Sequence, residues 1–306
     1  MSTPSPRWRA VRAIAVFAVA LVLLMAGNLA LYASSRHWAE DGLQLGDFDK
    51  PDRIDLTVWV NRVDTETTTV AATITDIEAN GKYADADGHL RMDTKLLSNS
   101  FTNPTVNLPS GESVPVIEQK FGMVGIPTDY PFDRYSAFLG LNIAADDDTA
   151  LPTTLTVFNN DSFFRVGLAP DPDVEGDSVD ADLFLHRSTP TMVFAIFVMV
   201  LMLGLAAAAV TASYYALRWR RGLVLPACSM MAAILFALIP LRNAVPGGPP
   251  IGSLIDFAAF FIAEGVISIA LITSVVLGYR HDIAYERAEA AKAGLSIDEF
   301  ALGRKP

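Results

Sequence analysis

The stretch from Met192 to Leu217 reads MVFAIFVMVLMLGLAAAAVTASYYAL and contains no Asp, Glu, Lys, Arg or His. A helix of about 20 apolar residues is long enough to cross the hydrocarbon core of a bilayer. Three other stretches of the chain also reach this length, so the sequence predicts four transmembrane helices. They cover residues 13–33, 192–217, 223–241 and 251–277.

Basic residues beside these spans predict the orientation of the chain. Three arginines lie in residues 1–12, and three more follow the second span at residues 218–221. Cytoplasmic flanks of membrane spans carry an excess of Lys and Arg. Residues 1–12 and 279–306 are therefore expected in the cytoplasm and residues 34–190 outside it. This topology predicts a multi-pass protein of the cell inner (plasma) membrane, with the lipid bilayer as a partner.

The first span has an alternative interpretation as a cleaved secretory signal. It follows basic residues, and Ala33 to Ser35 are small residues of the kind found at cleavage sites. Its apolar run is longer than the roughly 7 to 15 residues typical of a signal, which favours a retained helix. The domain that follows is exported in either case.

The region between the first two spans is strongly acidic. From Ser35 to Arg187 there are 27 Asp and Glu and 11 Lys and Arg, so the net charge is 11 − 27 = −16. A nucleic-acid partner is not expected, because such proteins present basic surfaces. The single cysteine, Cys228, lies in an apolar stretch, so an intrachain disulfide is not possible and this domain must be held by its own core.

Alternating side chains in this region predict β-strands. Residues 54–61, IDLTVWVN, place apolar and polar residues on opposite faces, as in a half-buried strand. Comparable runs cover residues 67–77, 89–97, 135–143, 153–158, 163–168 and 181–186. Turn residues separate the runs, which favours an extracytoplasmic antiparallel β-sandwich between helices 1 and 2, with a barrel or jelly roll as the alternative. The whole chain is thus predicted to be an α+β membrane protein.

The segment DYPFDRY, Asp129 to Tyr135, gathers charged, aromatic and turn residues. Asp129 and Asp133 are candidates for a carboxylate pair that performs acid and base chemistry in a surface hydrolase. The favoured alternative is a turn that begins a strand, in which Phe132 enters the core and Asp133 pairs with Arg134 or caps the backbone. No Ser, Cys or His nucleophile accompanies the segment, so we expect no catalytic site and no enzyme activity.

A second acidic run resembles the spacing of a calcium loop. Asp171, Asp173, Glu175 and Asp182 occupy its first, third, fifth and twelfth positions, and Gly176 the sixth. Neither flank has helical periodicity, so a solvated acidic linker is favoured over a weak calcium site. The sequence contains no other metal or cofactor motif, and no cofactor is expected.

Two carboxylates lie in the fourth span, where a charge is costly. Arg242 ends the third span, and an ion pair between Arg242 and Asp256 across the Pro-Gly-rich loop is expected. Glu264 has no charged partner in the sequence pattern. It is either a proton-binding or ion-pathway group, or a protonated or hydrogen-bonded packing group.

The cytoplasmic tail is rich in Ala, Glu, Arg and Lys from Asp282 to Ala293. This composition predicts a helix that stops at Gly294. A second helix is expected to start at residues 296–299.

The DYPFDRY segment and the loop motif RNxxPGxPPxGxxxD, from Arg242 to Asp256, resemble an uncharacterised family of bacterial membrane proteins, common in mycobacteria and other actinobacteria. The resemblance covers nearly the whole chain. It implies an exported β-domain followed by three spans, and it implies no activity.

These observations favour a non-enzymatic envelope protein. Its outer β-domain would act as a binding or scaffold module, or as an accessory subunit of another membrane or envelope protein. The alternative is a small ion-coupled transporter or channel-like protein that uses the carboxylates of helix 4.

Overall fold

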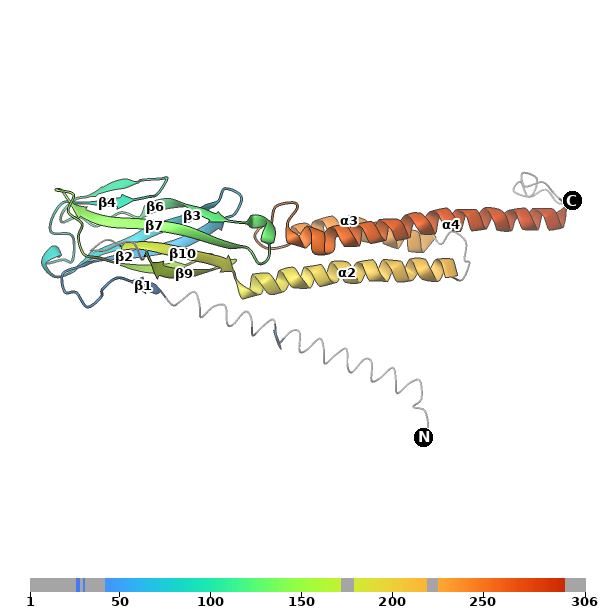
Figure 1. The fold of residues 1–306 in the computed structure, drawn as a ribbon, viewed down its shortest axis with the longest axis horizontal. Coiled ribbons are helices and arrows are strands. Elements are labelled where there is room, and N and C mark those ends of the chain that lie inside the picture. Colours follow the sequence, from blue (N-terminus) through green and yellow to red (C-terminus); the bar gives the residue numbers. More distant parts are fainter. Residues whose placement is uncertain (1–25, 28–29, 31–41, 172–178, 219–224, 295–306) are drawn as a thin grey trace, which may run out of the picture. The chain divides into compact units, whose positions relative to one another are not determined.

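The computed structural model describes residues 26–27, 30, 42–171, 179–218 and 225–294. The chain divides into two compact units, and Figure 1 labels most of their strands and the three long helices. The β unit comprises the chain up to Pro127 together with Phe132–Met192. The helical unit comprises Thr128–Pro131 and the chain from Val193 onward. A segment of four residues between two strands of the β unit therefore belongs to the helical unit.

The described part of the β unit is built on a sheet of ten strands. Their order is β1-β8-β2-β3-β6-β7-β10-β9, and β4 joins β7 off this path and carries β5. The strands are β1 (Leu43–Leu45), β2 (Ile54–Asp64), β3 (Thr69–Ala79), β4 (Thr94–Ser98), β5 (Thr105–Leu108), β6 (Ile117–Gly125), β7 (Arg134–Ala145), β8 (Thr153–Asn159), β9 (Phe164–Pro170) and β10 (Val179–Arg187). Two short 3-10 helices, η1 (Gly81–Tyr83) and η2 (Pro127–Asp129), lie in the loops.

The alternation in the sequence places one face of each long strand in the core. In β2, Ile54, Leu56, Val58 and Val60 are all buried, whereas the residues between them are partly exposed. Inward residues from β2, β3, β6, β7, β8 and β10 form one hydrophobic cluster. Full burial of such a side chain contributes about 1.5–3 kcal/mol, so this cluster is the main stabilising feature of the unit.

Strand β6 joins the two halves of the sheet, and it is not among the strands that the alternating pattern predicts. Its residues up to Gly122 pair with β3, whereas Met123–Gly125 pair with β7. The inward position Gln119 interrupts the apolar pattern. Its side chain is buried and accepts a hydrogen bond from Ser98 Oγ (2.8 Å), which compensates for the polar group.

The prediction of a wholly antiparallel sheet is wrong for one pair of strands. β2 and β8 run parallel, from Ile54 opposite Thr153 to Val60 opposite Asn159. Parallel neighbours need a long connection, and strands β3 to β7 lie between these two in the chain and supply it. The other strand pairs of the sheet are antiparallel.

Within the described residues, three helices are long and apolar enough to cross a membrane. They are α2 (Thr189–Arg218), α3 (Leu225–Asn243) and α4 (Phe261–Ala293), which is preceded without a break by the π-helical turn η3 (Asp256–Phe260). The predicted first span, residues 13–33, lies outside the described residues apart from positions 26, 27 and 30.

Small and polar side chains hold the helices together. Ala206, Ala259 and Ala263 belong to the buried cluster of the helical unit, and small residues allow close approach of helix backbones. Ser213 of α2 and Ser274 of α4 are buried and share a hydrogen bond of 2.7 Å between their hydroxyls.

The last helix differs from the prediction at its start and agrees with it at its end. It begins near Asp256 instead of at residue 251, because residues 251–253 form a turn that binds the Asp256 carboxylate. The predicted tail helix is confirmed and is continuous with the span. Gly294, at φ 67°, ends it in the left-handed conformation that glycine readily adopts. The predicted helix start at residues 296–299 lies outside the described residues.

Candidate functional site

A buried ion pair closes the loop between α3 and η3. Arg242 is in the last turn of α3, and Asp256 is the first residue of η3. Arg242 Nε lies 2.8 Å from Asp256 Oδ1, and Arg242 Nη2 lies 2.8 Å from Asp256 Oδ2. The same guanidinium donates to the carbonyl oxygens of Pro249 (3.0 Å) and Pro250 (2.9 Å). The arginine therefore holds both the carboxylate and the backbone of the loop.

The loop backbone completes the coordination of this carboxylate. The N–H groups of Gly252 (2.7 Å) and Ser253 (3.3 Å) donate to Asp256 Oδ2. Gly252 has φ 89° and Gly247 has φ 79°, a region that residues with a side chain rarely adopt. The Pro-Gly-rich composition is thus explained by a tightly turned loop built around one carboxylate.

Tyr130 packs against the same loop within the helical unit. Its side chain is fully buried and forms a cluster with Ala195, Val245 and Ile255. Its hydroxyl donates a hydrogen bond to the carbonyl oxygen of Pro246 (3.0 Å). The segment Thr128–Pro131 is thereby fixed to the loop that Arg242 and Asp256 close.

This arrangement functions as a structural lock. Asp256 receives two guanidinium and two backbone donors, so its oxygens are already occupied. Removing one partner of a buried ion pair costs about 3–5 kcal/mol, because the other charge is left uncompensated. The expected Arg242–Asp256 pair is present, and its geometry suits a positioning role better than proton transfer.

Glu264 has different surroundings. It lies in the first turn of α4 and is partly buried. Within the described residues it forms no hydrogen bond or ion pair, in contrast to Asp256. The structure therefore does not bring Glu264 into the Arg242–Asp256 lock.

The β unit contains a second buried ion pair that the sequence analysis did not predict. Arg187, the last residue of β10, contacts Asp133 through Nε (3.0 Å to each carboxylate oxygen) and Nη2 (2.9 Å to Oδ2). The Tyr135 hydroxyl donates to Asp133 Oδ2 at 2.8 Å. The guanidinium also stacks on Phe164, 4.2 Å from the ring centroid. Burial, and then the hydrogen bond to Asp133, raises the pKa of Tyr135 far above its ordinary value.

Two expected roles in the DYPFDRY segment are wrong. Phe132 is largely exposed, and Tyr130 is the aromatic residue that becomes buried. Asp133 pairs with Arg187 and not with Arg134, because β7 and β10 are neighbours and Arg134 faces outward. Asp129 is exposed at the end of η2, whereas Asp133 is fully buried in its ion pair. The carboxylates thus have opposite surroundings, which does not favour the hydrolase hypothesis.

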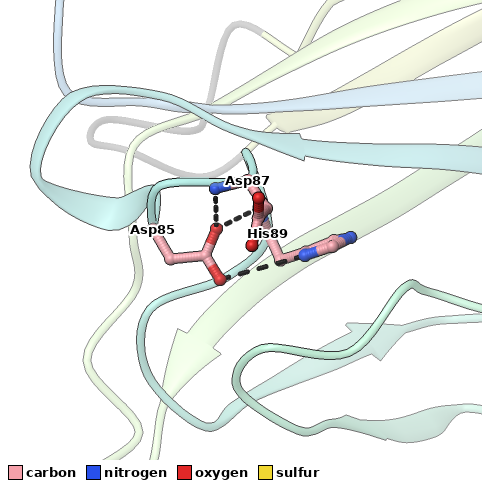
Figure 2. Close-up of side chains that lie close together, drawn as sticks. All are labelled: Asp85, Asp87 and His89. Atoms are coloured by element: carbon pink, nitrogen blue, oxygen red, sulfur yellow. Dashed lines mark hydrogen bonds and ion pairs between the residues drawn. The ribbon is translucent and has the colours of Figure 1, made fainter.

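A further cluster of metal-ligand side chains lies in the loop between β3 and β4. Asp85, Asp87 and His89 each offer one ligand atom, and these atoms lie within 4.8 Å of one another. Figure 2 shows the Asp85 carboxylate turned toward the other two residues. It accepts the backbone N–H groups of Asp87 (2.9 Å) and His89 (2.8 Å), and the latter bond lowers the pKa of Asp85. These hydrogen bonds stabilise a turn, and the turn is sufficient to bring the three side chains together. The spacing D-x-D-x-H is the signal in the sequence that could have located the cluster.

The predicted calcium run can be placed only at its ends. Asp173 and Glu175 lie outside the described residues. Asp171 follows β9, and its N–H donates to the carbonyl of Asp180 at 3.1 Å. Asp182 lies in β10 opposite Ala169. The calcium hypothesis stays a prediction.

Comparison with known families gives two matches. Residues 44–183 match a domain of unknown function, DUF4436, and residues 187–281 match another, DUF8686. No curated protein matches the chain. The boundary between the two matches falls at the end of β10, close to the passage from the β unit to the helical unit. The chain is thus similar to two uncharacterised domains joined in tandem.

Proposed function

We propose that this protein is a non-enzymatic membrane-anchored binding module, whose β unit recognises another protein of the membrane or envelope. In this proposal the chain has four spans with both termini in the cytoplasm. The β unit lies outside as a sandwich, and the helices anchor it as an accessory subunit of a larger assembly.

The observation that carries the proposal is that two buried carboxylates are fully engaged in ion pairs and hydrogen bonds. Asp133 is held by Arg187 and Tyr135, and Asp256 is held by Arg242 and the loop backbone. Two of the carboxylates that the sequence offered for chemistry, Asp133 and Asp256, are thus already saturated with donors. This supports a role in which the helices and the core hold a surface in place, and recognition occurs on that surface.

Affinity capture tests the binding role. The tagged full chain is cross-linked in its native membrane, extracted in mild detergent and analysed by quantitative mass spectrometry. A protein recovered in stoichiometric amount, and lost when exposed residues of the β unit are substituted, is the expected result. Recovery of the chain alone, across several detergents, would contradict the accessory-subunit role.

Labelling of introduced cysteines tests the topology. Asn61 in β2 and Tyr285 in α4 are both exposed. In a Cys228→Ser background, a membrane-impermeant maleimide added to intact cells should label Asn61→Cys and not Tyr285→Cys. Labelling of Tyr285→Cys alone would reverse the orientation.

A second candidate function, ion-coupled transport, is favoured by Glu264 alone. This carboxylate lies in a helix apolar enough to span a membrane and has no partner within the described residues. Unpaired ionisable groups in spans commonly mark proton or ion pathways.

Proton flux into vesicles that contain the purified chain separates the two functions. The binding role predicts the same flux for wild type, Glu264→Gln and the tail control Glu286→Gln. Flux that is present in the wild type and lost only in Glu264→Gln would establish the transport function instead.

A further inference from the structure

A row of basic side chains crosses three neighbouring strands of the β unit. Arg134 of β7 is opposite His186 of β10, and His186 is opposite Arg165 of β9. Paired residues of neighbouring strands project from the same face of a sheet. The adjacent positions Tyr135 and Leu185 are buried, so this row lies on the outer face. Arg134, His186 and Arg165, here called the basic row, are an exception in a domain with many more acidic than basic residues.

Exposed apolar side chains lie at the same end of the sheet. Ile126 is 60% exposed and follows Gly125, which pairs with Tyr135. Phe132 is 53% exposed and lies two residues before Arg134 in the chain. Phe163 is 43% exposed, and its carbonyl accepts the N–H of Ser188, the residue after β10. Ile126, Phe132 and Phe163, here called the apolar rim, therefore mark the end of the β unit where β10 leads into α2.

The outward residues of β10 change character along the strand. His186 lies next to the α2 end, Phe184 is an exposed aromatic residue, and Asp182 and Asp180 follow farther along. Burial, and then the neighbouring Arg165 and Arg134, lower the pKa of His186, so the positive charge beside the α2 end of β10 comes from these two arginines, whereas the far part of the strand is acidic. An anionic surface would attract the arginines and repel the acidic part, which gives the β unit a preferred orientation.

The position of α2 in the chain identifies the surface that this end meets. β10 ends at Arg187, and α2, a helix apolar enough to span a membrane, begins at Thr189. The connecting residue, Ser188, belongs to the β unit, and its hydroxyl contacts the Ser162 carbonyl oxygen (2.9 Å) and the Thr191 hydroxyl (2.9 Å). Only one residue separates the strand from the helix, so this end of the β unit cannot lie far from the level at which α2 leaves the bilayer.

We infer that the α2 end of the β unit rests on the membrane, with the apolar rim in the interfacial region and the basic row bound to the phosphates of anionic phospholipids. Aromatic and aliphatic side chains beside basic ones are the usual composition of such interfacial contacts. Arginine also suits the task chemically, because its planar guanidinium donates two parallel hydrogen bonds to a phosphate. The inference rests on the proposed export of the β unit.

Spin labels on either side of β6 test the apolar rim. Val116 and Ile126 directly flank this strand at its opposite ends, and they are 65% and 60% exposed. Each is changed to Cys in a Cys228→Ser background, labelled with a nitroxide, and placed as the full chain in phosphatidylglycerol-containing nanodiscs. Collisions with oxygen, which concentrates in lipid, and with a water-soluble nickel chelate then report depth. The label at residue 126 should show the higher oxygen-to-nickel ratio.

Lipid titration tests the basic row. The detergent-solubilised full chain is titrated with phosphatidylglycerol or phosphatidylcholine, and bound lipids are counted by native mass spectrometry. Arg134→Gln should weaken phosphatidylglycerol binding roughly fivefold, as expected for one basic group at a membrane surface, and Arg134→Lys should retain most of it. Arg91→Gln, which removes an exposed arginine elsewhere in the unit, should have no effect.

The outcomes separate this inference from the proposed function. Equal, water-like collision ratios at residues 116 and 126 would overturn the membrane contact, while the maleimide labelling of Asn61→Cys would still establish export. Equal losses in Arg134→Gln and Arg91→Gln would overturn the basic row as the lipid site. The depth measurement needs no arginine variant, so a folding defect in Arg134→Gln leaves the test intact.

Discussion

In the part of the chain that the structure describes, each unit contains one buried Arg–Asp pair, and the two pairs are satisfied in different ways. Arg242 and Asp256 receive their remaining hydrogen bonds from the backbone of the loop that they close. Asp133 and Arg187 are surrounded by side chains, through the Tyr135 hydroxyl and the Phe164 ring. The helical pair therefore fixes the conformation of one loop, whereas the β pair fastens two strands and depends on the packing around it.

The chain offers a separate reporter for each unit. Trp59 of β2 stacks on Phe158 with ring centroids 4.8 Å apart, and its emission follows the β unit once Trp8, Trp38 and Trp219 are changed to Phe. Cys228 lies in α3 and is the single cysteine, so its reaction with a thiol dye follows the helical unit. Differences between the two ion pairs can thus be measured in the same full chain.

The largest effect is expected for Arg187→Met. This change leaves Asp133 buried without its cation and should lower the free energy of unfolding of the β unit by about 3–5 kcal/mol. Denaturant unfolding in detergent, followed by Trp59 emission, measures it. Arg62→Met, at an exposed position of β2, is the control and should stay within about 0.5 kcal/mol of wild type. A similarly small effect of Arg187→Met would contradict a fastening role for this pair.

Arg242→Met should have a smaller effect that is confined to the helical unit. The Asp256 carboxylate that is left behind keeps its hydrogen bonds from the Gly252 and Ser253 N–H groups, and these bonds compensate part of the loss. We expect about 2–3 kcal/mol, below the range for fully buried pairs. On heating, Cys228 should react with the thiol dye at a lower temperature than in the wild type, because the helical unit opens earlier. The unfolding transition of the β unit, followed by Trp59 emission, should be unchanged. An equal shift of the Trp59 and Cys228 transitions would show that the two units unfold as one. That result would contradict an effect confined to the helical unit.

Tyr130→Phe tests the contact that fixes Thr128–Pro131 to the loop. It removes the hydrogen bond to the Pro246 carbonyl and keeps the buried ring, so the loss should be about 1 kcal/mol. The Cys228 reaction should report it, and Tyr83→Phe, in the β unit, should leave that reaction unchanged. No loss in Tyr130→Phe would mean that packing alone holds the segment.

Ser213→Ala tests the polar contact between α2 and α4. Hydrogen bonds between membrane helices contribute about 0.6 kcal/mol on average, and a loss of that size is expected in the Cys228 reaction. Thr211→Ala is the matched control, because the Thr211 hydroxyl donates to the Ala207 carbonyl oxygen of its own helix. Equal losses of stability in Ser213→Ala and Thr211→Ala would contradict a stabilising role for the hydrogen bond between α2 and α4.

The smallest effect is expected for Asp85→Asn, and it depends on pH. The pKa of Asp85 is lowered from 3.8 in the folded chain, chiefly by the hydrogen bond from the His89 N–H. The carboxylate therefore stabilises the fold above pH 3.8, and this contribution is lost as the pH falls through the lower folded value. Wild type and Asp85→Asn should therefore differ slightly in stability at neutral pH and converge as the pH falls below the folded pKa of Asp85. A constant difference would contradict this explanation.

Sequence reasoning reached the helical pair because one short loop separates its members. Arg242 and Asp256 are 14 residues apart, at the ends of two apolar stretches that must lie antiparallel, so an ion pair between them was a geometric expectation. The same reasoning located the long apolar helices and the stop at Gly294, because these features depend on local composition.

The β pair was out of reach for the opposite reason. Asp133 and Arg187 are 54 residues apart, and only the register of β7 against β10 brings them together. Alternation shows which residues face inward but not which strands are neighbours. It also failed at β6, where Gln119 stands at an inward position, and it gave Phe132 the core position that Tyr130 occupies in the helical unit.

A double-mutant cycle in each unit tests most directly whether the buried charges are structural. Asp133→Asn and Arg187→Met form one cycle, followed by Trp59, and Asp256→Asn and Arg242→Met form the other, followed by Cys228, with partner capture and proton flux measured on the same variants. Each single change is expected to destabilise its own unit, and each double change is expected to cost at least about 2 kcal/mol less than the sum of the two single changes, because contacting charges are coupled. Additive and small losses of stability, together with complete loss of capture or flux, would contradict a structural role and assign the pairs to the activity itself.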